Sequence, residues 1–315
     1  MAKNKIQFQQ GLSLTEFLSK YGDEDKCYQS LLRFRWPNGF VCPKCGSKGH
    51  CEIQTRNVFQ CHYCRTQTSL LSRTIFASTK LPLTVWFLAI YLITQSKDGI
   101  SSLNLGRTLG VSANTALRIK HKIQQTMKEQ DDSRPLRNLI LIDDAYWGGK
   151  KQDGVRGRGA TGKIPFLASV SLSEEGHPIK MRLSRVTGFL KDEISAWGKK
   201  HLSPFSLVVS DGLNCFPGVK EAKCNHEAVI THTENGYDVD KVFKWVNVMI
   251  GNVKNALHGT YHHVSTRHLP RYLAEFCYRF NRRFDLHKIV DRLACVSMRT
   301  PPMPQRLLKL AEVRW

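Results

Sequence analysis

Two stretches of the sequence decide the fold: Leu139-Ile140-Leu141-Ile142-Asp143 and Leu207-Val208-Val209-Ser210-Asp211. Short apolar runs rich in branched residues are typical of buried strands, and each of these runs leads directly into an aspartate. The backbone is rigid at a strand end, so we expect both carboxylates to be held in fixed positions. There they would bind metal ions that catalyse reactions of phosphates. An acid that follows a strand is often an ordinary turn residue, so the rest of the chain has to decide between the two interpretations.

The charge balance of the 315-residue chain favours a polyanion as partner. Lys and Arg outnumber Asp and Glu by 47 to 26, which gives a formal net charge of +21. Nucleic acid is the commonest polyanion, and a basic surface without such a partner is the alternative. The N-terminus lacks the apolar core of a signal peptide, and the longest apolar stretch, residues 81–94, is shorter than the roughly 20 residues of a membrane span. We therefore expect a cytoplasmic protein with reduced cysteines and no membrane partner.

Four of the ten cysteines have the spacing of a zinc ribbon. Cys42 and Cys45 form one CxxC pair, Cys61 and Cys64 form a second, and fifteen residues separate the pairs. Each pair places two thiolates on one tight turn, so two turns complete the tetrahedral shell of a structural Zn²⁺. A redox function is the alternative for one CxxC pair, and two pairs in register make it a poor explanation. Some residues nearby are spare ligands that a four-thiolate shell does not need: His50, Cys51 and His62.

Residues 101–127 predict a helix-turn-helix. The pattern indicates a short helix over 101–109, a turn at 110–112 with Ser112 as N-cap, and a second helix over 113–127. On the second helix one face is apolar and is expected to face the core: Ala116, Ile119, Ile123 and Met127. The opposite face is expected to point outward and to contact DNA in the major groove: Asn114, Thr115, Arg118 and Lys122. Helical hairpins of this kind also occur in proteins that bind no DNA.

The segments after Asp143 predict the element order of an RNase H-like core. Strands are expected near 165–172 and 177–184 with a hairpin between them, then a helix over 192–200, the strand that ends at Asp211, and a short strand over 228–231. In such a core the first acid lies on the first strand and the second acid on the fourth, side by side in space. Asp143 and Asp211 occupy those two places.

A helix is expected over residues 239–258, with one apolar face and two polar residues of interest. Asn247 and Lys254 are seven residues apart, so they project from nearly the same side of a helix, about 10 Å from each other. An amide oxygen can ligate a hard cation, and a lysine can hold a phosphate. The alternative is that both residues simply face solvent.

Six segments add a more specific indication. They are LRFRWPNGFVCPKC (32–45), TIFASTKLPL (74–83), DDAYWGGK (143–150), VSDG (209–212), GTYHHVS (259–265) and RYLAEFCYRFNRR (271–283). In these segments the chain resembles insertion-sequence transposases that combine an N-terminal zinc ribbon with a retroviral-integrase-like catalytic domain. The resemblance extends over almost the whole chain, and its two C-terminal segments are the most specific.

The resemblance implies the residues of the catalytic metal site. Asp143 and Asp211 are its first two members, with Mg²⁺ or Mn²⁺ as the cation. The third position in the family precedes a lysine on the last catalytic helix by seven residues and is often Glu. Here Asn247 stands at that position and Lys254 matches the lysine. Some members of the family are similar in having Asn, so we interpret the site as a variant triad that carries one negative charge fewer.

The expected function is that of a DNA transposase that binds terminal inverted repeats, cleaves DNA at the transposon ends and transfers the freed strand, as a homo-oligomer on double-stranded DNA in a prokaryotic cell. The zinc ribbon and helix-turn-helix are expected to recognise the repeats. Backbone phosphates are expected to contact the basic residues Lys150, Lys151, Arg156 and Arg158. A second basic group either does the same or is ordinary surface: Arg279, Arg282 and Arg283.

The fold expected is multidomain: a small zinc ribbon, an all-α part with the helix-turn-helix, and an α/β RNase H-like core with a mixed sheet and flanking helices. The predicted division is an N-terminal helical segment (1–35), the zinc ribbon (36–72), the helical region (73–130), the catalytic domain (137–290) and a C-terminal tail (291–315). Two rival functions stay open. One is a DNA-binding regulator derived from a transposase that no longer cuts, and the other is a structure-specific nuclease that does not join strands.

Overall fold

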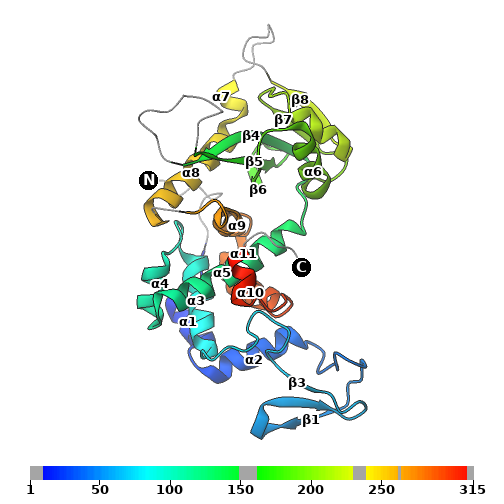
Figure 1. The fold of residues 1–315 in the computed structure, drawn as a ribbon, viewed down its shortest axis with the longest axis vertical. Coiled ribbons are helices and arrows are strands. Elements are labelled where there is room, and N and C mark those ends of the chain that lie inside the picture. The colour runs from blue at the N-terminus through cyan, green and yellow to red at the C-terminus, as the bar shows by residue number, and fades with distance from the viewer. Residues whose placement is uncertain (1–9, 149–161, 230–238, 262–263, 311–315) are drawn as a thin grey trace. The chain divides into compact units, whose positions relative to one another are not determined.

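A computed structural model of the chain describes residues 10–148, 162–229, 239–261 and 264–310. The chain forms two compact units, which are labelled by element in Figure 1. Unit 1 combines the N-terminal part of the chain, up to Thr126, with the C-terminal part from Arg282, and unit 2 is Met127–Asn281. The C-terminal segment from 282 onward therefore belongs to the same unit as the N-terminal helices. The division into five segments given above stays a prediction.

A helical cluster forms the base of unit 1. Its helices are α1 (Leu14–Tyr21), α2 (Glu24–Arg35), α3 (Leu83–Gln95), α10 (Ile289–Ser297) and α11 (Gln305–Leu310), with a 3₁₀ helix, η3 (Arg283–Lys288), before α10. The Ser13 and Glu16 side chains form a capping box that starts α1. Glu24 of α2 accepts hydrogen bonds from two backbone N–H groups at the start of α3, those of Leu83 at 2.8 Å and Thr84 at 3.1 Å. A carboxylate at a helix N-terminus satisfies donors that have no partner within the helix, so this contact joins α2 to α3.

A three-stranded antiparallel sheet forms the zinc-ribbon part of unit 1. It consists of β1 (His50–Ile53), β2 (Val58–Cys61) and β3 (Gln67–Ser69), with a short 3₁₀ helix, η1 (Gln54–Arg56), between the first two strands. Its small core is aromatic: Trp36, Phe40 and Phe59 lie with ring centroids 4.9–5.6 Å apart. A sheet of this size buries too little apolar surface to be stable alone, so a metal or another staple is expected nearby.

The predicted helix-turn-helix is present as α4 (Ser102–Leu109) and α5 (Ala113–Asp132). Ser101 caps α4, and Gly110 ends it in the left-handed conformation with φ 68°. Ser112 Oγ accepts the backbone N–H of Thr115 at 3.2 Å, which caps α5 as expected. The four residues predicted to face the core are all buried: Ala116, Ile119, Ile123 and Met127. The helix runs five residues beyond its predicted end.

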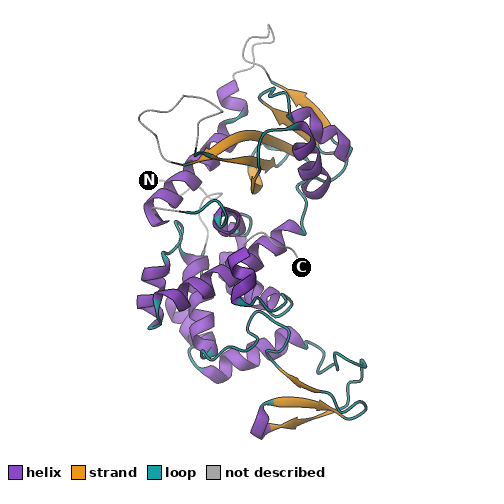
Figure 2. Cartoon of the chain, in the orientation of Figure 1, coloured by secondary structure: helices purple, strands orange, loops and turns teal. Residues whose placement is uncertain are grey.

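Unit 2 is built on a mixed five-stranded sheet, whose strands and flanking helices Figure 2 distinguishes by colour. The strands are β4 (Leu139–Trp147), β5 (Ile164–Leu172), β6 (Pro178–Arg185), β7 (Leu207–Ser210) and β8 (Asn225–Ala228), in the spatial order β6-β5-β4-β7-β8. The pairs β4/β5 and β5/β6 are antiparallel, while β4/β7 and β7/β8 are parallel. This is the topology expected of an RNase H-like core, with the first and fourth strands adjacent.

Two separate hydrophobic cores cover the two faces of the sheet. On one face the strands pack against α8 (Lys244–Tyr261) and α9 (Leu269–Phe280), with Leu141, Ala145, Phe166 and Met181 among the buried residues. On the other face they pack against α6 (Lys191–His201) and the 3₁₀ helix η2 (Phe216–Ala222). Successive residues of a strand alternate between the two faces, which is why both runs that opened the sequence are apolar throughout.

The predicted bounds of two elements in unit 2 are wrong in detail. The last strand covers 225–228, three residues earlier than predicted, because its pairing with β7 starts at Asn225 opposite Leu207. The long helix is divided into α7 (Val239–Val242) and α8, and Phe243 lies at the break with its side chain 3% exposed. Among the described residues, no helix combines the length and the apolar character needed to cross a membrane.

Candidate metal centres and DNA-binding helix

The four cysteines of the ribbon come together on two similar turns. In the first, Gly46 N–H donates to Cys42 O at 2.9 Å; in the second, Arg65 N–H donates to Cys61 O at 3.1 Å. Both turns end in a residue with positive φ, 75° for Gly46 and 57° for Arg65. Each turn therefore brings the second thiol of its pair back beside the first, as the CxxC spacing predicts.

The geometry of the thiols fits a tetrahedral metal. The Cys42 and Cys64 sulfurs are 3.5 Å apart, as are those of Cys45 and Cys61, and all four lie within 4.8 Å of one another. Zinc–sulfur bonds of about 2.3 Å in a tetrahedron separate the sulfurs by about 3.8 Å. Hydrogen bonding with Thr66 lowers the pKa of the Cys64 thiol to about 6, which favours the thiolate at that position. Four thiolates complete the shell, and the His50 ring packs on Phe40 instead.

A second cluster forms where β4 and β7 run side by side. Their parallel register ends with Ile142 opposite Ser210, so the next residues of the two strands, Asp143 and Asp211, are neighbours. Asp211 follows the end of β7, as expected. Asp143 differs from the expectation, because β4 continues through it to Trp147 and stays paired with β5. Asp143 is therefore held rigidly in the middle of a long strand, at the point where the parallel partner strand β7 ends.

Asp144 joins these two aspartates. One carboxylate oxygen from each of Asp143, Asp144 and Asp211 lies within 4.8 Å of the other two, and all three side chains are partly exposed. Asp144 is not among the ligands predicted from the sequence, which were Asp143, Asp211 and Asn247. The sequence feature that could have indicated Asp144 as a member of the cluster is its position directly after Asp143. Hard cations such as Mg²⁺ or Mn²⁺ prefer oxygen ligands about 2.0–2.1 Å away, so three convergent carboxylates suit one or two of them.

The two residues predicted on the last catalytic helix both lie on α8, which packs across β4 and β5. Asn247 is exposed, and its backbone N–H donates to Phe243 O at 3.0 Å, at the start of α8. Lys254 is partly buried, and burial followed by the nearby Lys163 lowers the pKa of its ammonium, while Asp143 and Asp144 act in the opposite direction. Lys254 is therefore close enough to the acidic cluster to interact with it. The metal-ligand role of Asn247 stays a prediction.

The outward face of α5 is only partly as predicted. Asn114 and Arg118 are exposed and Thr115 is partly exposed. Lys122 is instead turned toward the protein: its ammonium donates to Ile75 O at 2.9 Å and lies 5.6 Å from the centroid of the Trp86 ring. Burial lowers the pKa of Lys122. Helical spacing alone could not predict the inward position of Lys122. The loop that carries Ile75 covers that turn of α5, and this loop comes from another part of the sequence.

The remaining basic residues divide into two groups. Those expected in the glycine-rich stretch lie outside the described residues: Lys150, Lys151, Arg156 and Arg158. The C-terminal group does not form the basic surface that was considered. Arg279 is buried in an ion pair with Glu275 (2.6 Å), Arg282 is 6% exposed, and Arg283 stacks on Phe284 with its pKa lowered by burial to about 10.

Comparison with known proteins agrees with this geometry. The family profile described as the ISXO2-like transposase domain matches residues 135–281, and that of the transposase zinc-ribbon domain matches residues 22–67. A Halobacterium salinarum protein described as an uncharacterized protein in transposable element ISH50 is 25% identical over 243 residues, which are 70% of this chain and 78% of that protein. A solved chain from the Mos1 transposase paired-end complex with left transposon end covers 66% of this chain and 78% of its own, at 9% identity and a TM-score of 0.21, too low for a structural argument. The two domain matches, the cysteine quartet of the ribbon and the acidic cluster of the sheet make the chain similar, over residues 22–67 and 135–281, to insertion-sequence transposases with an N-terminal zinc ribbon.

Proposed function

We propose that this protein cleaves DNA at the ends of its own insertion sequence and joins the freed 3′-hydroxyl to target DNA. The observation that supports this most strongly is the group of three carboxylates at the point where β4 and β7 meet. Carboxylates so close together repel one another and are retained where they hold a multivalent cation. Such a cation, when bound, activates the attacking water or hydroxyl and stabilises the attacking and leaving oxygens of phosphodiester exchange.

The residues around the cluster have separate roles in this proposal. Asp143 and Asp211 hold the cations and Asn247 supplies the third ligand. Lys254, which interacts with the acids, holds a non-bridging oxygen of the scissile phosphate and offsets its negative charge. The chain supplies no covalent intermediate, because cleavage and joining are both direct displacements at phosphorus.

Recognition of the ends is assigned to unit 1. The N-terminal turns of α5 present Asn114 and Arg118 to solvent, and residues at that end of a recognition helix contact base edges in the major groove. The zinc ribbon is proposed to recognise the ends together with this helix. The basic residues Lys150, Lys151, Arg156 and Arg158 of unit 2 are proposed to contact backbone phosphates. The described part of the chain holds one acidic cluster of this kind, and an element has two ends, so we propose a homo-oligomer on DNA, acting in a prokaryotic cell.

The test uses the purified full chain and a DNA fragment that carries the gene with its flanking sequences. We expect imperfect inverted repeats in the flanks, Mg²⁺- or Mn²⁺-dependent nicks at their outer boundaries, and joined products when target DNA is added. Asp143→Ala and Asp211→Ala should abolish both products and keep end binding, because they remove ligands of the cation and leave the DNA contacts. Binding of the ends without any metal-dependent nick would favour the regulator, and nicks without joined products would favour the nuclease.

The third ligand is tested separately, because Asp144 is a structural competitor of Asn247. If the Asn247 amide is a ligand, Asn247→Ala should lower cleavage by about 10²-fold or more. Asn247→Asp restores a charge on a stem of the same length, so it should stay active and need less Mg²⁺ for half-maximal rate. Asn255→Ala is the matched control, since Asn255 is exposed on the same helix. Wild-type cleavage by Asn247→Ala, together with inactivity of Asp144→Ala, would transfer the ligand role to Asp144.

A further inference from the structure

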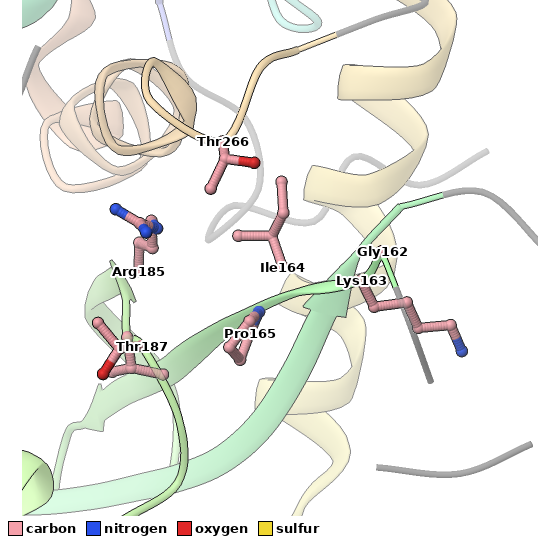
Figure 3. Close-up of a pocket in the computed structure, with 8 residues that line it drawn as sticks. Gly162, Lys163, Ile164, Pro165, Arg185, Thr187 and Thr266 are labelled. Carbon is pink, nitrogen blue, oxygen red and sulfur yellow. The ribbon is translucent and has the colours of Figure 1, made fainter. Parts of the chain in front are cut away.

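A cavity of about 230 Å³ lies at the end of the sheet where β5 begins and β6 ends. Figure 3 shows Ile164 and Pro165 at the start of β5, Arg185 at the end of β6, and Thr266 facing them from above. The side chain of Lys163 points away from these residues in the same view. None of the residues that line the cavity is acidic. We call this cavity the Arg185 pocket.

The strand register places Arg185 on the same face of the sheet as Asp143. Asp143 lies between Leu141 and Ala145, which face α8 and α9, and Arg185 follows Met181 and Leu183 with the same alternation. Ala145 pairs with Phe166, and Phe166 pairs with Arg185. Arg185 is therefore two strands across and two residues along from Asp143, an offset of about 12 Å between the backbones at ordinary strand spacing and rise.

The loop that closes the pocket is held from both ends. Thr266 lies between Val264 and Leu269, and both of these residues are buried in the core under α8 and α9. Within the loop, the backbone N–H groups of His268 and Leu269 both donate to Ser265 O at 3.0 Å. These contacts order the backbone of the loop that carries Thr266, whose side chain lines the pocket.

The opposite wall is also fixed by hydrogen bonds. The carboxylate of Glu193 accepts from the Thr187 backbone N–H at 2.7 Å, from the Thr187 hydroxyl at 2.7 Å and from the Gly188 backbone N–H at 3.0 Å. These contacts hold the turn after β6 and so fix the strand end that carries Arg185. Glu193 itself is not among the residues that line the pocket.

This chemistry selects a phosphodiester rather than a metal ion or an apolar ligand. Arg185 lines the cavity, and a guanidinium presents five N–H donors in a planar fork that matches the oxygens of a phosphate. Thr266 offers a hydroxyl donor, while Ile164 and Pro165 supply an apolar floor of the kind that a sugar ring packs against. A cation site would need carboxylates among the lining residues, and there are none.

We propose that the Arg185 pocket binds a backbone phosphate of the DNA strand that is being cleaved, on one side of the scissile phosphate. The proposal rests on the proposed function, since it takes DNA as the substrate of the acidic cluster. The offset of about 12 Å corresponds to a phosphate within about four nucleotides of the scissile one, at 3.4 Å of helix axis per nucleotide. The pocket would set the position of the DNA strand along the site. When one backbone phosphate is held in the pocket, a single other phosphate of that strand lies over the carboxylates.

The experiment combines changes in the DNA and in the protein. Single phosphates on either side of the cleavage point are replaced one at a time by neutral methylphosphonates, and cleavage by the full-length protein is measured. For the wild type we expect one flanking position where the substitution lowers the rate about 10- to 100-fold, the size of effect of a charge-assisted hydrogen bond. Arg185→Ala should lose a similar factor on unmodified DNA and lose nothing more at that position. Arg137→Ala is the matched control, because Arg137 is an exposed arginine before the opposite end of β4, and it should behave as wild type.

The outcomes separate this proposal from the proposed function. Equal sensitivity of the wild type and Arg185→Ala at every flanking position, or a wild type insensitive at all of them, overturns the pocket assignment while cleavage itself stands. A wild type that binds its ends without cleaving them overturns the proposed function. The affinity for each methylphosphonate-substituted DNA is then measured instead of the cleavage rate, and it decides for or against the pocket. If Arg185→Ala fails to fold, Arg185→Gln takes its place, since it keeps most of the stem and removes the charge.

Discussion

Replacing Asp211 by Asn should make the metal-free protein more stable and strongly reduce its stabilisation by divalent cations. Three carboxylates with oxygens within 4.8 Å of one another repel when no cation lies between them. Asn has the same size as Asp and keeps the hydrogen-bond acceptor, so the change removes one charge from the cluster and little else. The stability of unit 2 therefore reports on the cluster without any need for a DNA substrate.

The magnitude follows from the separation. Two unit charges at the 4.8 Å limit interact by about 0.9 kcal/mol in water and about 3.5 kcal/mol at an effective dielectric constant of about 20. Asp211 faces two such neighbours, but all three side chains are partly exposed and Lys254 lies close enough to offset part of the repulsion. We expect a net gain of about 1–3 kcal/mol, or roughly 3–10 °C in the melting temperature of a unit of this size.

Scanning calorimetry of the full chain, with and without Mg²⁺, measures this. Wild-type unit 2 should gain about 1.4 kcal/mol at a Mg²⁺ concentration ten times the dissociation constant, and Asp211→Asn should gain much less. Glu174→Gln is the control, because Glu174 is exposed in the turn between β5 and β6 and its loss removes the same charge. A lower melting temperature for metal-free Asp211→Asn, with an unchanged response to Mg²⁺, would show that the three carboxylates do not form one cation site.

Three further outcomes are expected. Cys61→Ser should lose the bound zinc in a metal assay and expose the ribbon to protease while the melting transition of unit 2 stays unchanged; zinc content equal to wild type would contradict the four-thiolate site. Arg118→Ala should reduce the slope of log K against log salt by about 0.9 with little loss of stability, whereas Lys122→Met should cost about 1–2 kcal/mol of stability and leave the slope unchanged; the reverse pattern would return Lys122 to the DNA interface. Burial lowers the pKa of His201 to about 3, so the unfolded chain takes up a proton below its ordinary pKa of about 6.5 while the folded chain does not. Stability should therefore fall by up to about 1.4 kcal/mol per pH unit as the pH drops from about 6.5 toward 3, and denaturant unfolding of His201→Phe should show a flatter dependence.

Features that depend on local patterns were predicted correctly. Each CxxC pair fixes its own turn, and the apolar spacing of α5 identified the face that is buried. The two apolar runs before Asp143 and Asp211 indicated strands that are covered on both faces, and such strands occur in the middle of a sheet. The meeting of the two aspartates was predicted from the element order of an RNase H-like core, in which the first and fourth strands are neighbours.

Features that depend on a partner from elsewhere in the chain were missed. Lys122 has the spacing of an outward residue, but the loop around Ile75 accepts its ammonium. Arg279 looks like surface charge in the sequence, and only the packing of α9 shows that it is buried with Glu275. The break at Phe243 follows from the insertion of that ring into the core, because helix propensity alone would have continued the helix.

The sequence by itself indicated the chemical groups of this protein: the four cysteines of a zinc ribbon, two strand-borne acids and a strongly basic chain. Those conclusions rest on the spacing of residues along the chain, which does not depend on how the chain folds. The tertiary structure decided which side chains converge. It brought Asp144 to the first two acids, turned Lys122 inward and formed the Arg185 pocket from β5, β6 and the loop before α9. A convergent site depends on distances between segments that are far apart in sequence, and those distances are fixed only when the sheet and its two hydrophobic cores have formed.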